Sequence, residues 1–156
     1  MVRNFYFAHP TSMYDTPVER LISQRFQREF PDTRVENPNQ PCHSEGYQRG
    51  GMDYFVQLCD AQDGVFFATH SDGSVGAGVA KEIASFSERH APIYAFDPAQ
   101  ERFVQVSDLS SFSVLDVDHT RKTLSHEREL KAAGVDPFQN LDTFRESTRH
   151  GFETVA

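Results

Sequence analysis

The sequence predicts an α/β fold with a parallel sheet, and three observations lead to this prediction. Short apolar runs alternate with amphipathic stretches across residues 2–96, in the order expected for repeated strand–helix units. The runs are rich in β-branched and aromatic residues and contain few polar positions, which is typical of strands covered on both faces. A glycine-rich turn at 73–78 joins one run to the next amphipathic stretch. Together these features favour parallel strands linked by helices.

The first strand–helix unit is the clearest. Residues 2–8, VRNFYFA, are expected to form a buried strand. Thr16 suits the N-cap of the following helix, Pro17 suits its first turn, and Glu19 completes a capping box. Apolar residues then recur at helical spacing until a proline ends the pattern. A short second strand is expected at 33–36.

The next segment is polar and is expected to be a loop, whose residues 39–50 suit a mobile lid because long loops are often functional. A second helix is expected at 51–61, followed by an apolar third strand at 64–69. The glycine-rich turn leads into a third helix at 77–89 and a fourth strand at 91–96.

The regular alternation ends after the fourth strand. Segments 102–106 and 112–117 have the pattern of strands, and residues 120–133 have the pattern of a charged helix. The polar tail at 135–156 is expected to pack on the body or on a second subunit. Its apolar anchors are Phe138, Leu141, Phe144 and Phe152.

These elements describe one domain at 1–156, with a core at 1–118 and a C-terminal helix and tail at 119–156. The expected architecture is a Rossmann-like or flavodoxin-like three-layer sandwich with a parallel sheet of about five strands.

Composition excludes several classes of protein. The net charge of −8, from 15 basic and 23 acidic residues, argues against a nucleic-acid duplex or an anionic membrane as partner. No apolar stretch is long enough to cross a bilayer, and the first residues do not resemble a secretion signal. The two cysteines are expected to be reduced thiols in a cytoplasmic protein.

The glycine-rich turn is a candidate anion site. In parallel α/β sheets, ligands bind at the carboxyl ends of the strands, where this turn and the start of the third helix meet. Backbone N–H groups at a helix N-terminus attract anions, and Ser71 and Ser74 offer hydroxyl donors. A plain tight turn is an equally good interpretation of the glycines.

Glu82 is the most informative residue of the third helix. On a helical wheel it lies on the flank of a buried stripe formed by Val79, Ile83 and Phe86, whereas Lys81 points to solvent. A carboxylate at the edge of a buried stripe loses water and needs a partner. A boundary glutamate satisfied by an arginine or a hydroxyl is the alternative interpretation.

Three short motifs resemble those of the nucleoside deoxyribosyltransferase-like superfamily, which includes the 2′-deoxynucleoside 5′-phosphate N-hydrolases. The superfamily has an I-Y-F strand, an A-D-hydrophobic strand, and a glycine loop running into G-[VT]-[AG]-x-E-[LI]-[GA]. The resemblance covers residues 3–97 in order. The counterparts here are Phe5-Tyr6-Phe7, Gln62-Asp63-Gly64-Val65-Phe66 and Gly78-Val79-Ala80-Lys81-Glu82-Ile83-Ala84.

The resemblance implies that Glu82 is a nucleophile that attacks the anomeric carbon and expels the base. It also implies a second acid on the preceding helix, for which Asp53 is the candidate. His9 directly follows the first strand and suits phosphate binding or protonation of the departing base, or else a structural turn. The expected substrate-binding residues are Tyr6, His9, Ser12, Asn37, Ser74, Gly76 and Gly78.

The expected function is cleavage or transfer at the N-glycosidic bond of a nucleoside or nucleoside 5′-monophosphate, without a metal or other cofactor, in a homodimer or larger homo-oligomer. The alternative is a non-catalytic nucleotide-binding or signalling module, and a third possibility is cleavage of NAD-like dinucleotides. The run at 116–119 is interpreted as a helix N-terminus capped by Asp118 rather than as a metal site. Cys42 and His43 are adjacent loop residues and do not suggest a catalytic thiol.

Overall fold

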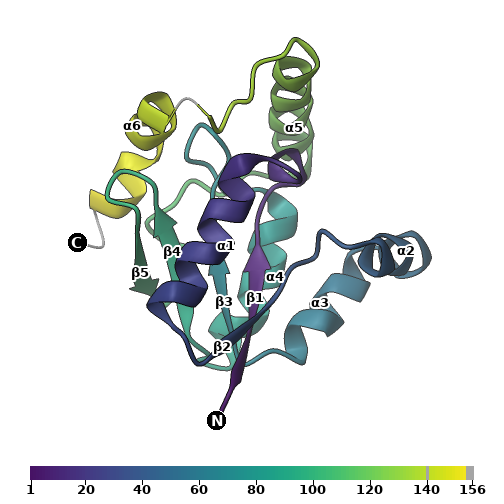
Figure 1. Cartoon of the computed structure of the whole chain (residues 1–156). Helices are drawn as coiled ribbons and strands as arrows, with labels where there is room; N and C mark the ends of the chain where they lie inside the picture. Colours follow the sequence, from purple (N-terminus) through teal and green to yellow (C-terminus); the bar gives the residue numbers. More distant parts are fainter. Residues whose placement is uncertain (140, 154–156) are drawn as a thin grey trace.

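The computed structural model describes residues 1–139 and 141–153 and contains a five-stranded sheet with the order β2-β1-β3-β4-β5 (Figure 1). The first four strands are parallel, and β5 is antiparallel to β4. Only residues 98–101 connect β4 to β5, which is too short for a crossover to a parallel strand. The α/β prediction is confirmed. The strands are β1 (Arg3–Ala8), β2 (Thr33–Glu36), β3 (Gly64–Phe67), β4 (Ile93–Asp97) and β5 (Arg102–Val106).

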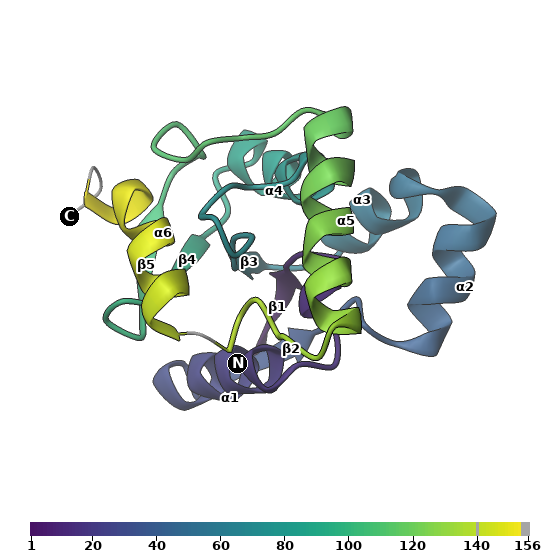
Figure 2. The same ribbon diagram turned by 90° about the horizontal axis from the view of Figure 1, so that it is seen from above.

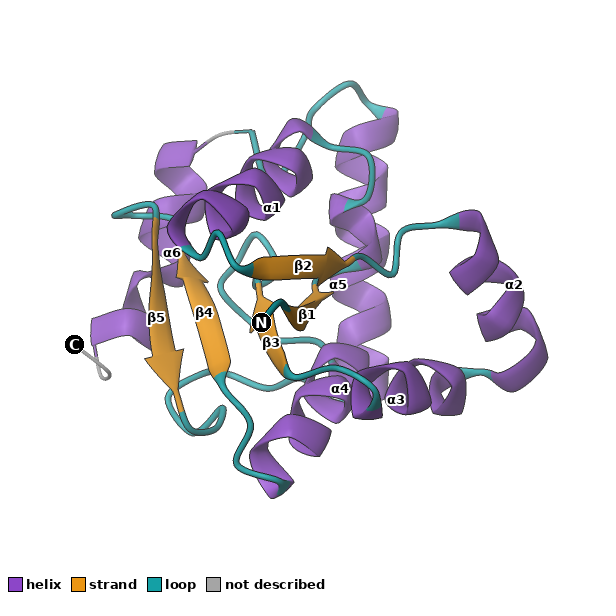
Figure 3. Ribbon diagram, turned by 60° about the horizontal axis from the view of Figure 1, so that its bottom comes forward, coloured by secondary structure: helices purple, strands orange, loops and turns teal. Residues whose placement is uncertain are grey.

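Helices lie on both sides of the sheet, with α1 on one side and α3 and α4 on the other (Figure 3). Side chains of β1 alternate between the two layers, because successive residues of a strand point to opposite faces. Phe5 and Phe7 join the cluster on the α1 side, and Tyr6 and Ala8 join the cluster on the α4 side. The helices are α1 (Pro17–Glu29), α2 (Pro41–Gly50), α3 (Met52–Asp60), α4 (Ala77–Glu88), α5 (Val117–Ala132) and α6 (Leu141–Glu153).

The segment expected to be a lid loop is a helix. Pro41 occupies the first turn of α2, and Gly51 ends it with a positive φ of 61°. His43 is buried and its Nδ1 lies 2.6 Å from the hydroxyl of Tyr54 on α3. These contacts hold α2 and α3 as a helical hairpin that projects from the body (Figure 2). Tertiary packing, rather than hydrophobic periodicity, makes this polar segment helical.

The expected strand at 112–117 is also absent. Only a single bridge, between Val75 and Val114, forms there, and α5 begins at Val117. Asp116, not Asp118, caps the helix by accepting a hydrogen bond from the N–H of His119. Since the cap lies two residues earlier than expected, α5 is one half-turn longer at its start.

The C-terminal region packs on the body of the same chain. Phe138 and Phe144 are buried in the cluster on the α1 side, and Phe152 is buried in the cluster on the α4 side. The side chain of Leu141, also expected to be an anchor, lies outside the described part of the chain. None of the helices described is long and apolar enough to span a bilayer.

Candidate functional site

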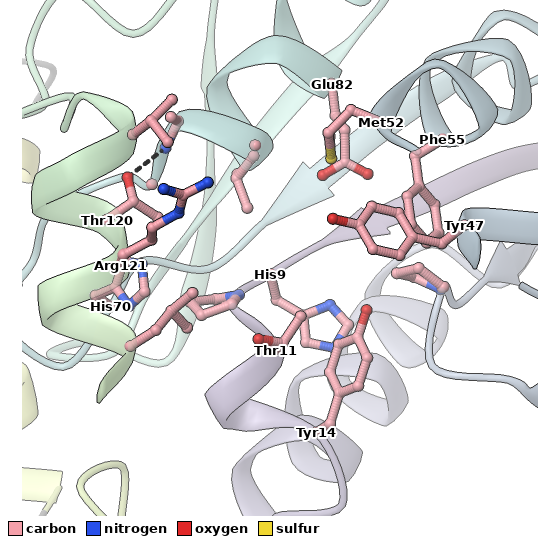
Figure 4. Close-up of a pocket in the computed structure, with 18 of the residues that line it drawn as sticks. His9, Thr11, Tyr14, Tyr47, Met52, Phe55, His70, Glu82, Thr120 and Arg121 are labelled. Carbon is pink, nitrogen blue, oxygen red and sulfur yellow. Dashed lines mark hydrogen bonds between the residues drawn. The ribbon is translucent and has the colours of Figure 1, made fainter. Parts of the chain in front are cut away.

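A cavity of about 480 Å³ opens at the carboxyl ends of β1 and β3 (Figure 4). Four parts of the chain form its walls: the loop after β1, the α2–α3 hairpin, the first turns of α4, and one face of α5. This is the edge of the sheet at which parallel α/β folds bind ligands. The residues discussed below that line it are Tyr6, His9, Tyr14, Tyr47, Met52, Phe55, His70, Gly76, Gly78, Glu82, Thr120, Arg121 and Arg128.

Glu82 lies in the wall of the cavity and is almost completely buried, with 7% of the residue exposed. The hydroxyl of Tyr6, from the neighbouring strand β1, donates a hydrogen bond to Oε2 of Glu82. No ion pair involves Glu82 within the described chain, and its carboxyl group points into the cavity (Figure 4). The position of Glu82 on the flank of the α4 stripe accounts for this placement.

The surroundings of Glu82 favour its neutral form. Burial raises the pKa of Glu82 to about 8, and the hydrogen bond from Tyr6 partly opposes this change. Burial, and then the charge of Glu82, raise the pKa of Tyr6 far above its usual range, so the phenol remains a hydrogen-bond donor. Burial likewise raises the pKa of Tyr14, whose ring enters the cavity from the loop after β1 (Figure 4).

His9 lines the cavity, but both of its ring nitrogens face acceptors of the protein. Nδ1 lies 2.9 Å from the carbonyl oxygen of Phe7, and Nε2 lies 2.7 Å from Oε2 of Glu19. Burial raises the pKa of Glu19, but the hydrogen bond and charge of His9 outweigh burial and lower it overall. These contacts support the structural interpretation of His9 over a direct role on a ligand.

The glycine-rich turn allows close approach of two other residues. A Cβ atom on Gly76 would lie 3.0 Å from Nε2 of His70 and 3.1 Å from Cγ2 of Thr120. Gly76 is also the N-cap of α4, and the N–H of Ala77 donates a 2.9 Å hydrogen bond to Oγ1 of Thr120. Gly73 has a φ of 85°, which a residue without Cβ adopts most readily. The glycines therefore bring α5 and the buried histidine against the start of α4.

The second carboxylate near this edge comes from α5, which the sequence motifs did not indicate. Glu127 is fully buried and holds together two loops. Its Oε1 accepts hydrogen bonds from Nδ1 of His70 at 2.6 Å and from Oγ of Ser12 at 2.7 Å. Its Oε2 accepts from N of Ser71 at 2.8 Å and from Oγ of the same residue at 2.6 Å. Burial raises the pKa of Glu127, but the hydrogen bond and charge of His70 and the bonds from Ser71 lower it overall.

The helical spacing of α5 contained a signal for Glu127. It lies three residues after Leu124 and three before Leu130, the two leucines of a mostly polar helix. Residues three apart share one face of a helix, so Glu127 was placed among the apolar positions of α5. Arg121 and Arg128 flank this face and line the cavity.

Asp53 does not reach the cavity. Its side chain is 83% exposed, and its carboxylate pairs with Nζ of Lys81 at 3.7 Å on the outer surface. Met52 and Phe55, on other faces of α3, line the cavity instead. The structure therefore does not bring the candidate second acid to Glu82.

The remaining expected residues divide into two groups. Tyr6, Gly76 and Gly78 line the cavity with Glu82. Ser12 faces Glu127, Oγ of Ser74 donates to Oδ1 of Asp72 at 2.5 Å, and Oδ1 of Asn37 accepts from N of Asn39 at 2.8 Å. Ser12, Asn37 and Ser74 are not among the residues that line the cavity.

Residues 1–139 and 141–153 contain no group of three or more His, Cys, Asp or Glu side chains placed to hold a metal ion. Asp116 and His119 contact each other at the exposed start of α5, with 2.8 Å between Oδ1 and Nδ1. No protein-family model, curated protein or solved structure matches the chain.

Proposed function

We propose that the protein cleaves or transfers the N-glycosidic bond of a nucleoside or nucleotide, with Glu82 as the nucleophile. The observation that carries this proposal is a buried carboxyl group in the wall of a cavity, held by Tyr6 and free of ion pairs within the described chain. The resemblance of the Gly78–Ala84 motif to the superfamily described above supports the same role for Glu82.

The proposed reaction has two steps. One oxygen of ionised Glu82 forms a bond to the sugar carbon C1′ while the C1′–N bond breaks, and the electron pair leaves with the base, which takes a proton from solvent. Water, or a nitrogen of a second base, then attacks C1′ and releases the carboxylate. Positive charge develops on the sugar in both steps, and a poorly hydrated carboxylate stabilises that charge strongly.

The side chains beside Glu82 support a position of the base at this end of the cavity. Tyr47, Met52 and Phe55 lie beside Glu82 and give this end of the cavity an apolar wall suited to a planar base (Figure 4). The hydroxyl of Tyr14 makes no hydrogen bond within the described chain, and in the proposal it donates to the base or to a sugar hydroxyl. Tyr6 holds Glu82 beneath the sugar.

The proposal is tested by incubating purified protein with matched pairs of nucleosides and their 5′-monophosphates, and with NAD⁺, and measuring free base by liquid chromatography. A second base is added in parallel reactions to distinguish transfer from hydrolysis. Release of base from any substrate supports the proposal. If nucleotides bind but none of the reactions releases base, a non-catalytic nucleotide-binding module is favoured instead.

The pH dependence of base release distinguishes a nucleophile from a proton donor. Because the nucleophile is the ionised carboxylate and the pKa of Glu82 is about 8, kcat/KM is expected to rise with pH and level off above about pH 8. In Tyr6→Phe the rise is expected at higher pH, since the hydrogen bond from Tyr6 lowers the pKa of Glu82. Initial rates at low substrate across the pH range measure both profiles.

A profile that falls as pH increases through about 8 would contradict this assignment, because it would require the protonated form of Glu82. Tyr54→Phe is a suitable control, since it removes a tyrosine hydroxyl on α3 that contacts His43 rather than Glu82. Its profile is expected to match that of the wild type.

The homo-oligomer and the cytoplasmic location stay predictions. Sedimentation of the purified chain measures the first, and imaging or fractionation of the source cells measures the second.

A further inference from the structure

The α2 helix is the least firmly held part of the cavity wall. Of its ten residues, Pro41–Gly50, all of them described, only His43 is buried. Gly46 and Gly50 lower its intrinsic stability, and isolated helices of this length are marginal in water. In Figure 3, α2 lies at the outside of the molecule, connected at one end to β2 and at the other to α3. A short helix with few buried contacts is typical of segments that open locally without global unfolding.

The side chain of His43 joins α2 to two other elements. Its Nε2 contacts Oε1 of Glu36, the last residue of β2, and its Nδ1 lies 2.6 Å from the hydroxyl of Tyr54 on α3. One ring nitrogen can donate to the carboxylate while the other accepts from the phenol, so both nitrogens have a partner. We call the contact between Glu36 and His43 the latch, because it connects α2 to the sheet.

The two ends of α2 differ in how they are held. Before α2, Nδ2 of Asn39 donates to Oδ1 of Asp15 at 3.0 Å and to Oε1 of Glu19 at 3.1 Å, which ties this end to the body. After α2, Gly51 has a φ of 61° and a ψ of −149°, and a Cβ atom there would meet nothing within 4 Å. Glycine reaches other backbone conformations at little cost, and Gly50 precedes it. The pair therefore suits a hinge, since hinges are a few element-terminal residues that absorb changes in φ and ψ.

The α2 helix also supplies side chains to the cavity. Ser44 and Tyr47 line it, and the ring centroid of Tyr47 lies 5.6 Å from that of Phe55 on α3. Tyr47 and Phe55 lie at the end of the cavity that contains Glu82 (Figure 4). A rotation of α2 about the two glycines would carry Ser44 and Tyr47 out of the wall and admit water at this end.

We propose that α2 is a gate at the Glu82 end of the cavity, which turns about Gly50 and Gly51 and is held closed by the latch. In the closed state, Ser44 and Tyr47 complete the wall and limit the access of water to Glu82, which is 7% exposed. In the open state, a ligand enters or leaves beside α3, which stays packed on α4. The gate goes beyond the proposed function, because it concerns access to the cavity and does not depend on which bond is cleaved there.

Hydrogen–deuterium exchange of the purified full chain, read by mass spectrometry of its peptides, measures the opening of α2. In the wild type, the amides of α2 are expected to have protection factors at least about 10-fold lower than those of α1 and α4, which each bury several side chains. Glu36→Ala removes the carboxylate of the latch. It is expected to lower protection in α2 by a further 10- to 100-fold or so, the range for a hydrogen bond to a charged group. Unchanged protection in α1 and α4 would show that the variant is folded.

Glu45→Ala is the matched control, because it removes the same side chain from an exposed position of α2 itself. It is expected to change protection in α2 by about twofold or less. Glu36→Gln keeps an oxygen that accepts from the imidazole, so its effect is expected to be smaller than that of Glu36→Ala. Wild-type α2 protected as well as α1, or Glu36→Ala without effect on α2, would overturn the gate. Equal losses of protection in all three helices would also overturn it, because they indicate global destabilisation.

Chemical labelling of Glu82 tests whether α2 controls access to the cavity. A water-soluble carbodiimide and an amine convert accessible carboxyl groups to amides, and peptide mass spectrometry gives the rate at each glutamate. In Glu36→Ala the labelling rate of Glu82 is expected to rise about 10-fold, in proportion to the opening of α2. Glu88, at the exposed end of the same helix, is expected to keep its rate.

An unchanged labelling rate at Glu82, together with faster exchange in α2, would show that α2 moves without covering the cavity, and would overturn the gate. Neither measurement uses a substrate. Failure of the gate is therefore distinguishable from failure of the glycosidic reaction, which the release of base measures.

Discussion

Replacing Glu82 with glutamine is expected to lower the rate of base release by roughly 10³-fold or more, the scale of losses when a nucleophile is removed. Glutamine keeps the shape of the side chain and can still accept the hydrogen bond from Tyr6. It cannot form the bond to C1′. The measurement is kcat/KM on the best substrate of the base-release screen. Rapid acid quenching and intact mass spectrometry are expected to detect a sugar adduct on the wild type only.

Glu88→Gln provides the control for this experiment. Glu88 is the last residue of α4 and is exposed, so the substitution makes the same charge change on the same helix without entering the cavity. Its rate is expected to stay within about twofold of the wild type. A Glu82→Gln variant that retains most of its activity would refute the nucleophile assignment, whatever the substrate.

The same substitution is expected to stabilise the folded protein at alkaline pH. The pKa of Glu82 is about 8 in the folded chain, above its usual value of 4.5, so the folded state binds a proton more tightly than the unfolded state. This group therefore favours folding most at low pH, and that contribution is lost as pH rises from about 4.5 through 8. Glutamine has no charge to bury. We expect Glu82→Gln to exceed the wild type in free energy of unfolding by on the order of 3 kcal/mol at about pH 9, and by much less at about pH 5.

Urea unfolding of both proteins at several pH values measures this difference directly. Comparing the two proteins cancels most of the pH dependence of other groups, such as Glu19 and Glu127, whose lowered pKa values act in the opposite direction at acid pH. Glu88→Gln is expected to show a difference that does not vary with pH. A constant difference between Glu82→Gln and the wild type would show that Glu82 is hydrated and carries no burial penalty.

Stability gained by removing Glu82, together with loss of activity, would be the expected signature of a functional residue. A buried carboxyl group that accepts a single hydrogen bond within the described chain contributes unfavourably to folding once it is ionised. Proteins retain such an unfavourable contribution to folding where the group is needed for function.

Local patterns were sufficient to predict much of the sheet and the three helices that cover it, α1, α3 and α4. The β1 run alternates between Phe5 and Phe7 on one face and Tyr6 on the other, and each is buried as the pattern predicts. Thr16 caps α1, with its Oγ1 accepting from N of Glu19 at 3.3 Å. These features depend on neighbouring residues, so the sequence contains the information directly.

Local patterns failed where a distant segment decides the conformation. Residues 41–50 contain few apolar residues, but Tyr54 of α3 packs on Gly46 and His43 and makes the segment a helix. Likewise Val114 pairs with Val75 in a single bridge instead of continuing as a strand. Tertiary contacts override weak local preferences in such segments.

The sequence by itself determined the α/β class, the buried flank position of Glu82, and the placement of a glycine turn beside it. These follow from periodicity within single elements. Only the tertiary structure decided that Asp53 faces solvent and that Nε2 of His9 contacts Glu19. It alone also decided that Arg121 and Arg128 of α5 line the cavity. The physical reason is that Glu127 and His70 are 57 residues apart and meet only when α5 packs across the carboxyl ends of the strands.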